Sequence, residues 1–533
     1  MNHIELFAGC GGLSLGLETS GFDLLLANEL SPMASETFAY NHLNADLEKL
    51  ENIEKVFWVS SQYDRNNISK RLRENPMEAT GLSKHSDIDG FNPTDNELNR
   101  GLLVGSIVDI NSLLSSNKYK LRDRISSGLG HGGVDLVSGG PPCQSFSLAG
   151  MRDHTHHRNT LPGEFANFVG MVKPKLALLE NVTGILRPFS VEGEKHYAWF
   201  EVAKAFAKEN YVPLCLHVNA KYVGTAQNRP RFIMIAFRHD VLKGFKKSTT
   251  DETIVNALKQ SERFVKLVRT KQEPNITDLD YFDVEKDDVF FRDSLLSPLI
   301  SHKEISSSKK ALANVKDAID DLRDKKIVES DYVRRINDEY LNYNDHKVNK
   351  LLNHELRNNN NKVRARFRLY QVMSKLSKTD TKSISNYMNT AGLEPINSET
   401  LSQLGKTWLL DLDGKKVSKP TKAKLLEILE QLYTKKRTQK ALIANAPAPA
   451  ALSIPDDACH YHESVKMQRT LTVREMARIQ SFPDWYEIRS KVTTGGKMRK
   501  FEVPQYTQIG NAVPPLLGMA LGNICKSILE QSK

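Results

Sequence analysis

The first 43 residues alternate short hydrophobic runs with a glycine-rich turn, and this pattern constrains the fold more than any other stretch of the chain. Residues 4–7 (Ile-Glu-Leu-Phe) predict a short strand, which ends in the turn Ala-Gly-Cys-Gly-Gly at 8–12. Leucines at 13, 15 and 17 predict a helix, and residues 24–28 predict a second, buried strand. A strand, a helix and a strand in this order predict a βαβ unit that begins a parallel sheet.

Further hydrophobic runs of strand length follow up to about residue 240. They are residues 102–104, 134–137, 176–179, 212–218 and 231–237. Amphipathic stretches separate these runs, so we predict a doubly wound α/β catalytic domain over residues 1–240. Residues 44–100 are rich in Asn, Ser, Lys, Asp and Glu, and we interpret them as an insertion that is partly helical and mostly on the surface.

The second half of the chain changes character twice. Residues 241–460 are polar and charged, with a basic cluster at 362–368 and an Ala-Pro linker at 446–450. Residues 461–533 are compact and helical again, with a Gly- and Pro-rich turn at 510–515. Lys plus Arg is 74 and Asp plus Glu is 64, so the net charge of +10 mildly favours a polyanionic partner.

Several protein classes are excluded by composition and patterning. The five cysteines are scattered without a CxxC pair, which argues against a disulfide scaffold or a cysteine-rich zinc site and fits a reducing cytosol. The first residues show no signal-peptide pattern, and no apolar run approaches the roughly 18 residues of a membrane span. We predict a cytoplasmic protein without a membrane segment. We also predict no metal site, because the histidines at 154–157 are not spaced as ligands with an acidic partner.

The glycine turn at 8–12 favours nucleotide binding. Glycines allow the backbone to approach a ligand closely, and the following helix N-terminus offers free N–H groups. The turn departs from GxGxxG because Ser14 occupies the last glycine position, which lowers the expectation of a dinucleotide dehydrogenase. Glu29 follows the second strand, where such folds bind ribose hydroxyls. The alternative interpretation is a tight turn beside an exposed glutamate.

A stiff loop, Gly-Gly-Pro-Pro-Cys-Gln-Ser at 139–145, follows the strand at 134–137. Its position predicts that Cys143 projects from the carboxyl edge of the sheet, where α/β proteins carry their sites. A lone cysteine is usually a structural residue. The surrounding glycines and prolines are unusual for a core, so we favour a nucleophile.

Two further groups of polar residues adjoin predicted strands, the first of them at the same edge as Cys143. Glu180 follows the strand at 176–179 and could act as an acid toward a ring nitrogen, although a capping or solvated glutamate is the alternative. Gln227, Arg229 and Arg231 alternate along an extended segment, which suits a phosphate or a base carbonyl. An ordinary basic strand edge is the alternative for these three.

Together these segments resemble the DNA (cytosine-5)-methyltransferase family. The residues that carry the resemblance are Phe-Ala-Gly-Cys-Gly-Gly at 7–12, Pro-Pro-Cys-Gln at 141–144, Glu-Asn-Val at 180–182, Gln-x-Arg-x-Arg at 227–231, Arg-Thr-Leu-Thr-Val-Arg-Glu at 469–475 with Gln-Ser-Phe-Pro at 480–483, and Gln-Ile-Gly-Asn-Ala-Val-Pro-Pro at 508–515. The resemblance covers roughly residues 3–43, 101–240 and 465–533. It implies a Rossmann-like S-adenosylmethionine-dependent methyltransferase sheet, with 241–460 as an inserted smaller target-recognition domain and 461–533 as a return to the catalytic domain.

The resemblance also implies catalytic roles. Cys143 matches the nucleophile that attacks carbon 6 of a cytosine flipped out of the duplex, and Glu180 matches the group that protonates ring N3. Arg231 matches an arginine near the base carbonyl, with Arg229 in support. DNA contacts are expected from Gln144, Ser145, Arg158 and Gln227. The basic cluster at 362–368 suits phosphate contacts, although a solvated helix face is the preferred interpretation for any single residue of it.

For the cofactor, the resemblance implies that S-adenosyl-L-methionine lies against residues of the first turn, with Glu29 on its ribose. The implied contacts are Phe7, Ala8, Gly9, Gly11, Gly12 and Leu13, with Ser106 and Ile107 at the adenine and Asn511 and Val513 at the methionine end. The family often has an aspartate on the adenine amine where this chain has Ser106, and Asp109 is a candidate substitute. The length of the 44–100 insertion is a second departure.

The resemblance implies a DNA (cytosine-5-)-methyltransferase that acts on double-stranded DNA. We further expect a monomer, associated with the bacterial nucleoid through its DNA, that belongs to a restriction-modification or defence system with cognate components. An RNA cytosine methyltransferase and a non-catalytic DNA-binding relative are the alternatives. An amino-directed DNA methyltransferase would carry an Asp/Asn-Pro-Pro-Tyr type loop where this chain has 141–144.

Overall fold

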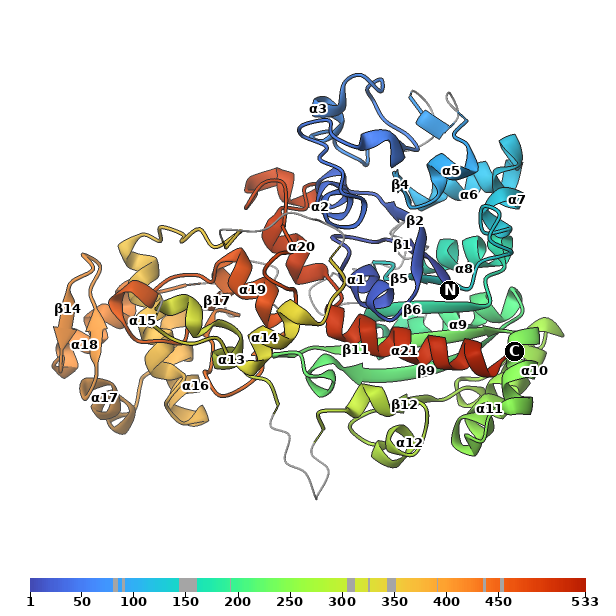
Figure 1. Cartoon of the computed structure of the whole chain (residues 1–533). Helices are drawn as coiled ribbons and strands as arrows, with labels where there is room; N and C mark the ends of the chain where they lie inside the picture. The colour runs from blue at the N-terminus through green and yellow to red at the C-terminus, as the bar shows by residue number, and fades with distance from the viewer. Residues whose placement is uncertain are drawn as a thin grey trace.

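The computed structural model (Figure 1) describes residues 1–79, 85–88, 92–142, 161–191, 193–303, 312–324, 326–342, 351–390, 392–434, 438–450 and 455–533. The residues from Cys143 to Thr160 lie outside the described ranges, so the predictions for Cys143, Gln144, Ser145 and Arg158 stay predictions.

A nine-stranded sheet forms the centre of the larger lobe, in the order β12-β9-β11-β6-β5-β1-β2-β4-β3. Its strands are β1 (Asn2–Leu6), β2 (Asp23–Glu29), β3 (Val56–Trp58), β4 (Gly101–Val104), β5 (Leu136–Gly139), β6 (Leu176–Val182), β9 (Tyr211–Asn219), β11 (Pro230–Arg238) and β12 (Tyr281–Asp283). Only β11 runs against its neighbours in this sheet. The doubly wound, mostly parallel α/β sheet predicted from the sequence is confirmed.

Helices cover the sheet and build the rest of the chain. They are α1 (Gly12–Thr19), α2 (Pro32–Leu43), α3 (Ile68–Arg71), α5 (Asp95–Leu98), α6 (Ile107–Ser116), α7 (Leu121–Ser126), α8 (Leu161–Val172), α9 (Ala198–Lys208), α10 (His239–Ser248), α11 (Glu252–Arg269), α12 (Asp288–Arg292), α13 (Val315–Ile319), α14 (Asp331–Asp338), α15 (Asn361–Met373), α16 (Lys378–Asn389), α17 (Ser398–Gly405), α18 (Lys422–Gln431), α19 (Val473–Ile479), α20 (Gln505–Asn511) and α21 (Pro515–Gln531). In the described part of the chain, no single helix has the length and apolarity to cross a membrane. A bent pair, Met498–Asn511 with Pro515–Gln531, meets that test only when its two halves are taken together.

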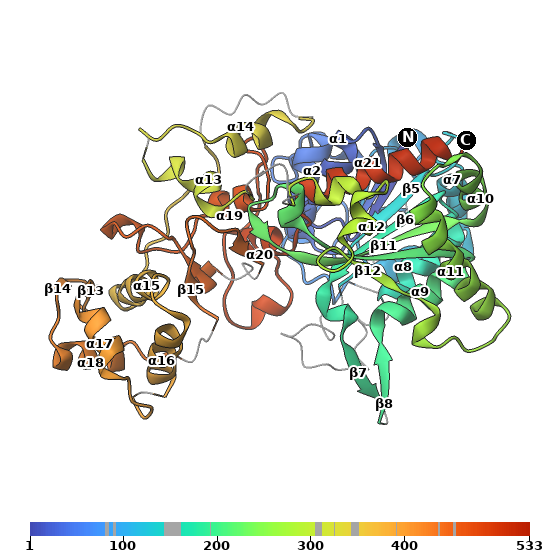
Figure 2. The same cartoon turned by 90° about the horizontal axis from the view of Figure 1, so that it is seen from below.

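The last helix packs on the first (Figures 1 and 2). The two backbones touch at glycines: a Cβ on Gly16 would lie 2.3 Å from the backbone nitrogen of Met519, and one on Gly518 would lie 3.0 Å from the Leu13 carbonyl oxygen. A larger residue at Gly16 would separate the helices. This contact returns the C-terminal segment to the first βαβ unit.

The segment 44–100 is more deeply integrated than the surface insertion expected from its composition. Strand β3 pairs with β4 and extends the sheet by one strand. Val56, Phe57 and Trp58 are buried, and Arg71 pairs with Asp87 at 2.8 Å in the interior. Its few hydrophobic residues are concentrated in one strand and one short helix, so an average over the segment hides them. The mostly-surface expectation is therefore wrong for this part.

Residues 241–460, expected to form one target-recognition domain, are divided between two hydrophobic cores. Helices α10 to α14 bury their apolar side chains in the same cluster as the large sheet. A separate cluster begins with α15 and ends at Cys459, and it holds Phe367, Leu404 and Leu429. We call residues 361–459 the small lobe. It contains the hairpin β13 (Trp408–Leu410) and β14 (Lys416–Ser418), and it lies to one side of the sheet in both views (Figures 1 and 2).

Short strand pairs complete the structure. β7 (Pro188–Val191) and β8 (Glu194–Tyr197) form a hairpin that projects below the sheet in Figure 2. β10 (Gln227–Asn228) pairs with β16 (Ala448–Pro449), and β15 (Lys440–Ala441) pairs with β17 (Ala458–Cys459). The β10–β16 pair connects the catalytic lobe to the small lobe.

Candidate active site

The predicted catalytic residues converge where β5, β6 and β11 meet. Gly139 pairs with Leu179, so the end of β5 lies beside the residue before Glu180. Ile233 of β11 pairs with Glu180, and Arg231 pairs with Val182. Because alternate residues of a strand share a face, the register brings the arginine to the glutamate.

Glu180 and Arg231 form a buried ion pair. The Arg231 Nε lies 2.6 Å from the Glu180 Oε1, and each residue is 8% exposed. Burial lowers the pKa of Arg231 and the adjacent carboxylate opposes that shift. The other Glu180 oxygen faces the loop after β5, because a Cβ on Gly140 would lie 2.9 Å from Oε2. The pair therefore sits directly against the backbone that leads to Cys143.

Asn181 fixes that loop. Its Nδ2 donates a hydrogen bond of 2.9 Å to the Pro141 carbonyl oxygen, and the contact is buried. Glu180 and Asn181 are consecutive residues of β6 with different roles. The Glu180 carboxylate faces the candidate site, and the Asn181 amide holds the backbone of the Gly-Gly-Pro-Pro loop. This separate role of Asn181 was not predicted from the sequence pattern.

Arg229 lies away from the Glu180 carboxylate and contacts the C-terminal segment. Its guanidinium donates to the carbonyl oxygens of Gly510 at 3.1 Å and Asn511 at 3.3 Å. Burial, followed by the charge of Arg231, lowers its pKa well below the usual value. This placement makes Arg229 a residue that positions the loop at 510–513.

Gln227 does not have the placement expected of a DNA contact. Its side chain is fully buried, and its Nε2 donates to the Pro449 carbonyl oxygen at 3.3 Å. The residue joins the catalytic lobe to Pro449 of the small lobe. A side chain in this position would have to leave its burial site before it could reach a duplex.

The predicted cofactor turn has a left-handed backbone at Phe7, Gly9 and Gly11. The Glu29 carboxylate closes the turn: Oε2 accepts from the Gly9 N–H at 2.8 Å and Oε1 accepts from the Ser31 N–H at 2.7 Å. Burial raises the pKa of Glu29. A Cβ on Gly9 would meet no atom of the described residues within 4 Å, so among these residues open space adjoins the backbone beside this carboxylate.

Some of the remaining residues of the turn face the predicted cofactor site, and others pack in the core. The N-terminus of α1 has no side-chain cap, which leaves N–H groups available after Gly11. Gly12 is required by packing, because a Cβ there would lie 2.3 Å from the Val513 carbonyl oxygen. Ala8 and Leu13 are buried, whereas Asn511 is exposed. The structure thus brings Val513 to the first turn, as the predicted methionine end requires.

A buried chain of hydrogen bonds next to the glycine turn was not predicted from the sequence. The Tyr486 hydroxyl donates to the Cys10 carbonyl oxygen and lies 3.0 Å from His42 Nε2, while His42 Nδ1 lies 2.6 Å from Glu18 Oε1. A Cβ on Gly11 would collide with both rings' polar atoms. These residues come from α1, α2 and the segment after α19, so no local pattern links them.

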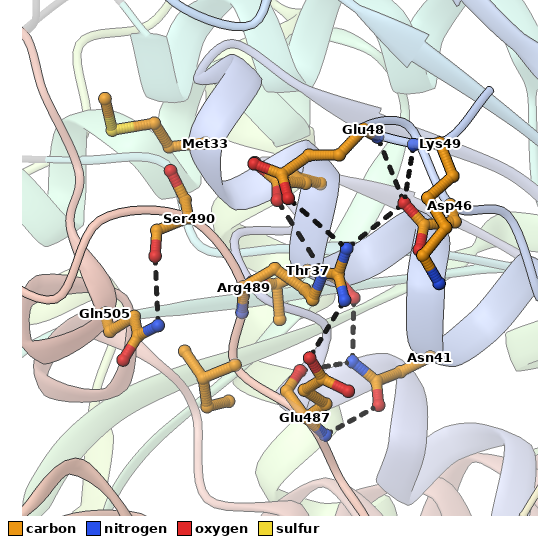
Figure 3. Close-up of polar contacts among 12 residues, drawn as sticks. Met33, Thr37, Asn41, Asp46, Glu48, Lys49, Glu487, Arg489, Ser490 and Gln505 are labelled. Atoms are coloured by element: carbon orange, nitrogen blue, oxygen red, sulfur yellow. Dashed lines mark hydrogen bonds and ion pairs between the residues drawn. The ribbon is translucent and has the colours of Figure 1, made fainter. Parts of the chain in front are cut away.

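A second network ties the late segment to α2 (Figure 3). Arg489 lies between Asp46 at 3.1 Å and Glu487 at 2.9 Å, and its backbone N–H donates to the Thr37 hydroxyl. Asn41 donates to the Glu487 carbonyl oxygen at 2.8 Å. Helix α2 begins directly after Glu29 and Ser31, so this network fixes the helix that adjoins the predicted ribose site.

At the predicted adenine end, Ser106 caps α6 by accepting from the Val108 N–H at 3.2 Å. Ile107 is buried in the main core. Asp109, the candidate substitute for the family's aspartate, is 5% exposed in the first turn of α6. Ser106 lines a pocket with Leu30 and Pro32, which follow β2, and with residues of the 44–100 segment, whereas Asp109 is absent from that lining.

The basic cluster at 362–368 is split by the structure. Lys362 is exposed and Arg364 and Arg366 are half-buried, but Arg368 is 2% exposed. The Arg368 guanidinium lies 3.9 Å from the centre of the Trp408 ring and donates to the Trp408 carbonyl oxygen. The expectation that Arg368 contacts phosphate is wrong in this conformation, because helix periodicity turns it into the small-lobe core.

Known proteins are similar to this chain over most of the residues described above. A family model described as C-5 cytosine-specific DNA methylase matches residues 1–64 and 111–527, and residues 65–110 fall between the two matches. The type II methyltransferase M.AgeI of Thalassovita gelatinovora is 25% identical over 542 residues, covering 99% of each chain. M.DdeI of Desulfomicrobium norvegicum is 28% identical over 240 residues, which is 45% of this chain and 41% of that protein.

Among solved structures, the S. pombe Dnmt2 methyltransferase matches with a TM-score of 0.39 and 13% identity, over 99% of this chain and 98% of that chain. The family match extends over most of the sequence and includes every strand of the sheet except β4. The chain therefore belongs to the C-5 cytosine-specific DNA methylase family.

Proposed function

We propose that the protein transfers a methyl group from S-adenosyl-L-methionine to carbon 5 of a cytosine in duplex DNA, through a transient bond between Cys143 and carbon 6. The observation that carries this proposal is the buried Glu180–Arg231 pair, held against the backbone that leads to Cys143. The family match supports the reaction class.

The turn at 7–12 suits the cofactor. The space beside Gly9 borders a carboxylate able to accept hydrogen bonds from a ribose diol, and the uncapped start of α1 offers N–H groups to a carboxylate. Val513 closes the far side of the turn. When bound there, S-adenosylmethionine supplies an electrophilic methyl group.

The chain's residues account for activation of the base. The Cys143 thiolate adds to carbon 6, and the electron pair of the C5–C6 double bond makes carbon 5 nucleophilic while the ring nitrogen N3 becomes basic. Glu180 supplies a proton to N3, and Arg231 stabilises the carboxylate that remains. After methylation, water takes the carbon-5 proton, the C5–C6 double bond re-forms with expulsion of the Cys143 thiolate, and N3 returns its proton to the Glu180 carboxylate.

The target base has to leave the duplex to reach this edge. Rotation out of the stack costs a few kcal/mol, which contacts between protein and DNA must offset. We propose that the small lobe supplies part of those contacts, with Lys362, Arg364 and Arg366 on phosphates. The type II names of relatives favour a role in marking DNA within a restriction-modification system.

Duplex DNA carrying 5-fluorocytosine tests the mechanism, because fluorine at carbon 5 cannot leave as a proton does. We expect a denaturation-resistant protein–DNA adduct that requires S-adenosylmethionine and disappears in Cys143→Ala. Cys215→Ala is the matched control, since Cys215 is a buried cysteine in the same sheet. An adduct that survives Cys143→Ala would overturn the assignment, and an adduct with tRNA alone would favour an RNA substrate.

A further inference from the structure

The pocket at the carboxyl ends of β2 and β4 has walls of two origins. Leu30, Pro32, Val104 and Ser106 come from the part of the sheet next to Glu29. Trp58, Ser60, Glu74 and Pro76 come from the 44–100 segment. The segment comes this close because Gly105 lacks a side chain: a Cβ there would lie 2.9 Å from the Val59 Cβ. The segment thus forms a wall of a pocket beside the predicted ribose site.

Glu74 is the carboxylate of this pocket. Its orientation is set by two hydrogen bonds to Oε2, one from the Ser61 hydroxyl at 2.9 Å and one from the Gln62 N–H at 3.0 Å. Neither of these bonds uses Oε1. Burial raises the pKa of Glu74 and the two hydrogen bonds oppose that rise. An oriented carboxylate with a second acceptor oxygen suits an N–H donor of a ligand.

The other walls suit a flat, mostly apolar ring. Pro32 and Pro76 are rigid and apolar, and Trp58 is 1% exposed. The Trp58 Nε1 is buried without a hydrogen-bond partner among the described residues. Arg71, held by Asp87, lies 5.2 Å from the Trp58 ring centre and fixes the indole from behind. Mostly apolar walls with a few placed polar groups, here Ser60, Glu74 and Ser106, are the usual form of a site for a small organic ligand.

We propose that Glu74 accepts a hydrogen bond from the exocyclic amine of the cofactor's adenine and that the 44–100 segment is therefore part of the cofactor site. This inference rests on the proposed function and deepens it. The Ser106 hydroxyl caps α6. The acceptor for the adenine amine is therefore expected from the 44–100 segment. Both Glu74 and Ser106 lie in the stretch 65–110, between the two parts of the family match.

The test measures the affinity of the whole protein for two probes by calorimetry. S-adenosylhomocysteine carries the amine, and S-inosylhomocysteine has an oxygen in its place. For the wild type we expect a preference of roughly tenfold to a hundredfold for the adenosyl probe, the range of a hydrogen bond to a charged group. In Glu74→Ala we expect that preference to fall toward unity, with little change for the inosyl probe.

Two further variants separate recognition from structural support. Glu78→Ala, an exposed glutamate of the same segment, should keep the wild-type preference. The double variant Glu74→Ala/Ser106→Asp should regain part of it, because aspartate keeps the α6 cap and offers an acceptor. Equal weakening of both probes in Glu74→Ala, or no weakening of either, would overturn the inference. Failure of wild type and Glu78→Ala alike to bind S-adenosylhomocysteine would instead count against the proposed function.

Discussion

Arg478 in the catalytic lobe is 2% exposed and lies between Asp321 at 2.8 Å and Asp484 at 2.6 Å, whereas Lys415 and Lys416 in the small lobe are exposed to solvent. The same contrast extends to other charges. Glu180–Arg231 and Arg469–Glu475 are buried pairs, while the small lobe buries few of its cations and Arg368 is one of them.

The contrast reflects what each lobe has to do. A buried charge is tolerated only with a fixed partner, and that requirement holds the catalytic groups in one geometry. An exposed lysine keeps its hydration and its mobility, so it can follow a phosphate backbone without a prepared site. We therefore expect mutations of buried, paired charges and mutations of exposed lysines to have different effects.

The largest effect is expected at the buried pair itself. Glu180→Gln keeps the shape of the side chain but removes its proton transfer, so methyl transfer in a single turnover should slow by roughly 10²- to 10⁴-fold. Binding of S-adenosylhomocysteine should not change. Glu194→Gln, an exposed glutamate on the β8 hairpin strand, is the control. A wild-type rate in Glu180→Gln would remove the carboxylate from the mechanism.

For the buried pair Arg469–Glu475, which lies outside the candidate site, we expect mutation to reduce the stability of the fold. Glu475 accepts both Arg469 donors at 2.7 Å, and although burial opposes ionisation, these contacts hold the pKa of Glu475 at about 2. Glu475→Gln should lower the free energy of unfolding by about 3–5 kcal/mol at neutral pH. The exposed pair Asp331–Arg334 offers a control, because Asp331→Asn should change little.

The pH dependence has a definite sign. The folded-state pKa of about 2 lies below the ordinary value of 4.5, so the stability contributed by Glu475 is present above pH 4.5 and is lost as pH falls toward 2. Urea unfolding across this window should therefore show a weaker loss on acidification in Glu475→Gln than in the wild type. Parallel curves would show that the pair contributes no such linkage.

The smallest effects on folding, and the largest on salt dependence, are expected in the small lobe. Replacing Lys362, Arg364 and Arg366 together by Ala should weaken duplex binding and reduce the slope of log affinity against log salt by roughly 0.9 for each phosphate that is no longer neutralised. Fluorescence anisotropy over a salt series measures this slope.

Arg368→Ala sharpens the comparison within one helix. Because Arg368 stacks on Trp408 inside the small lobe, its removal should lower thermal stability and leave the salt slope unchanged. A reduced slope in Arg368→Ala, or an unchanged slope in the triple variant, would remove the distinction between buried Arg368 and the more accessible cations of this segment.

The sequence alone predicted seven of the nine strands of the sheet and the edge at which Cys143 and Glu180 are expected to meet. Hydrophobic runs separated by amphipathic stretches fix parallel strands, and polar residues directly after such strands have to meet at one edge. This argument placed Glu180 at that edge, whereas Arg231 lies at the start of β11 and reaches the same edge, 2.6 Å from Glu180, because β11 runs antiparallel to β6. The glycine turn and Glu29 could also be predicted, because the residues that form a turn lie close together in the sequence.

Only the tertiary structure decided which neighbours the other residues have. Arg229 bonds to the backbone at 510–511, Gln227 is buried against Pro449, and Tyr486 supports Cys10, although these partners are hundreds of residues apart. The buried wall that carries Trp58 and Glu74 was likewise invisible in a segment of polar composition. Local patterns record the periodicity and polarity of one segment, whereas these contacts depend on which distant segments the folded core brings together.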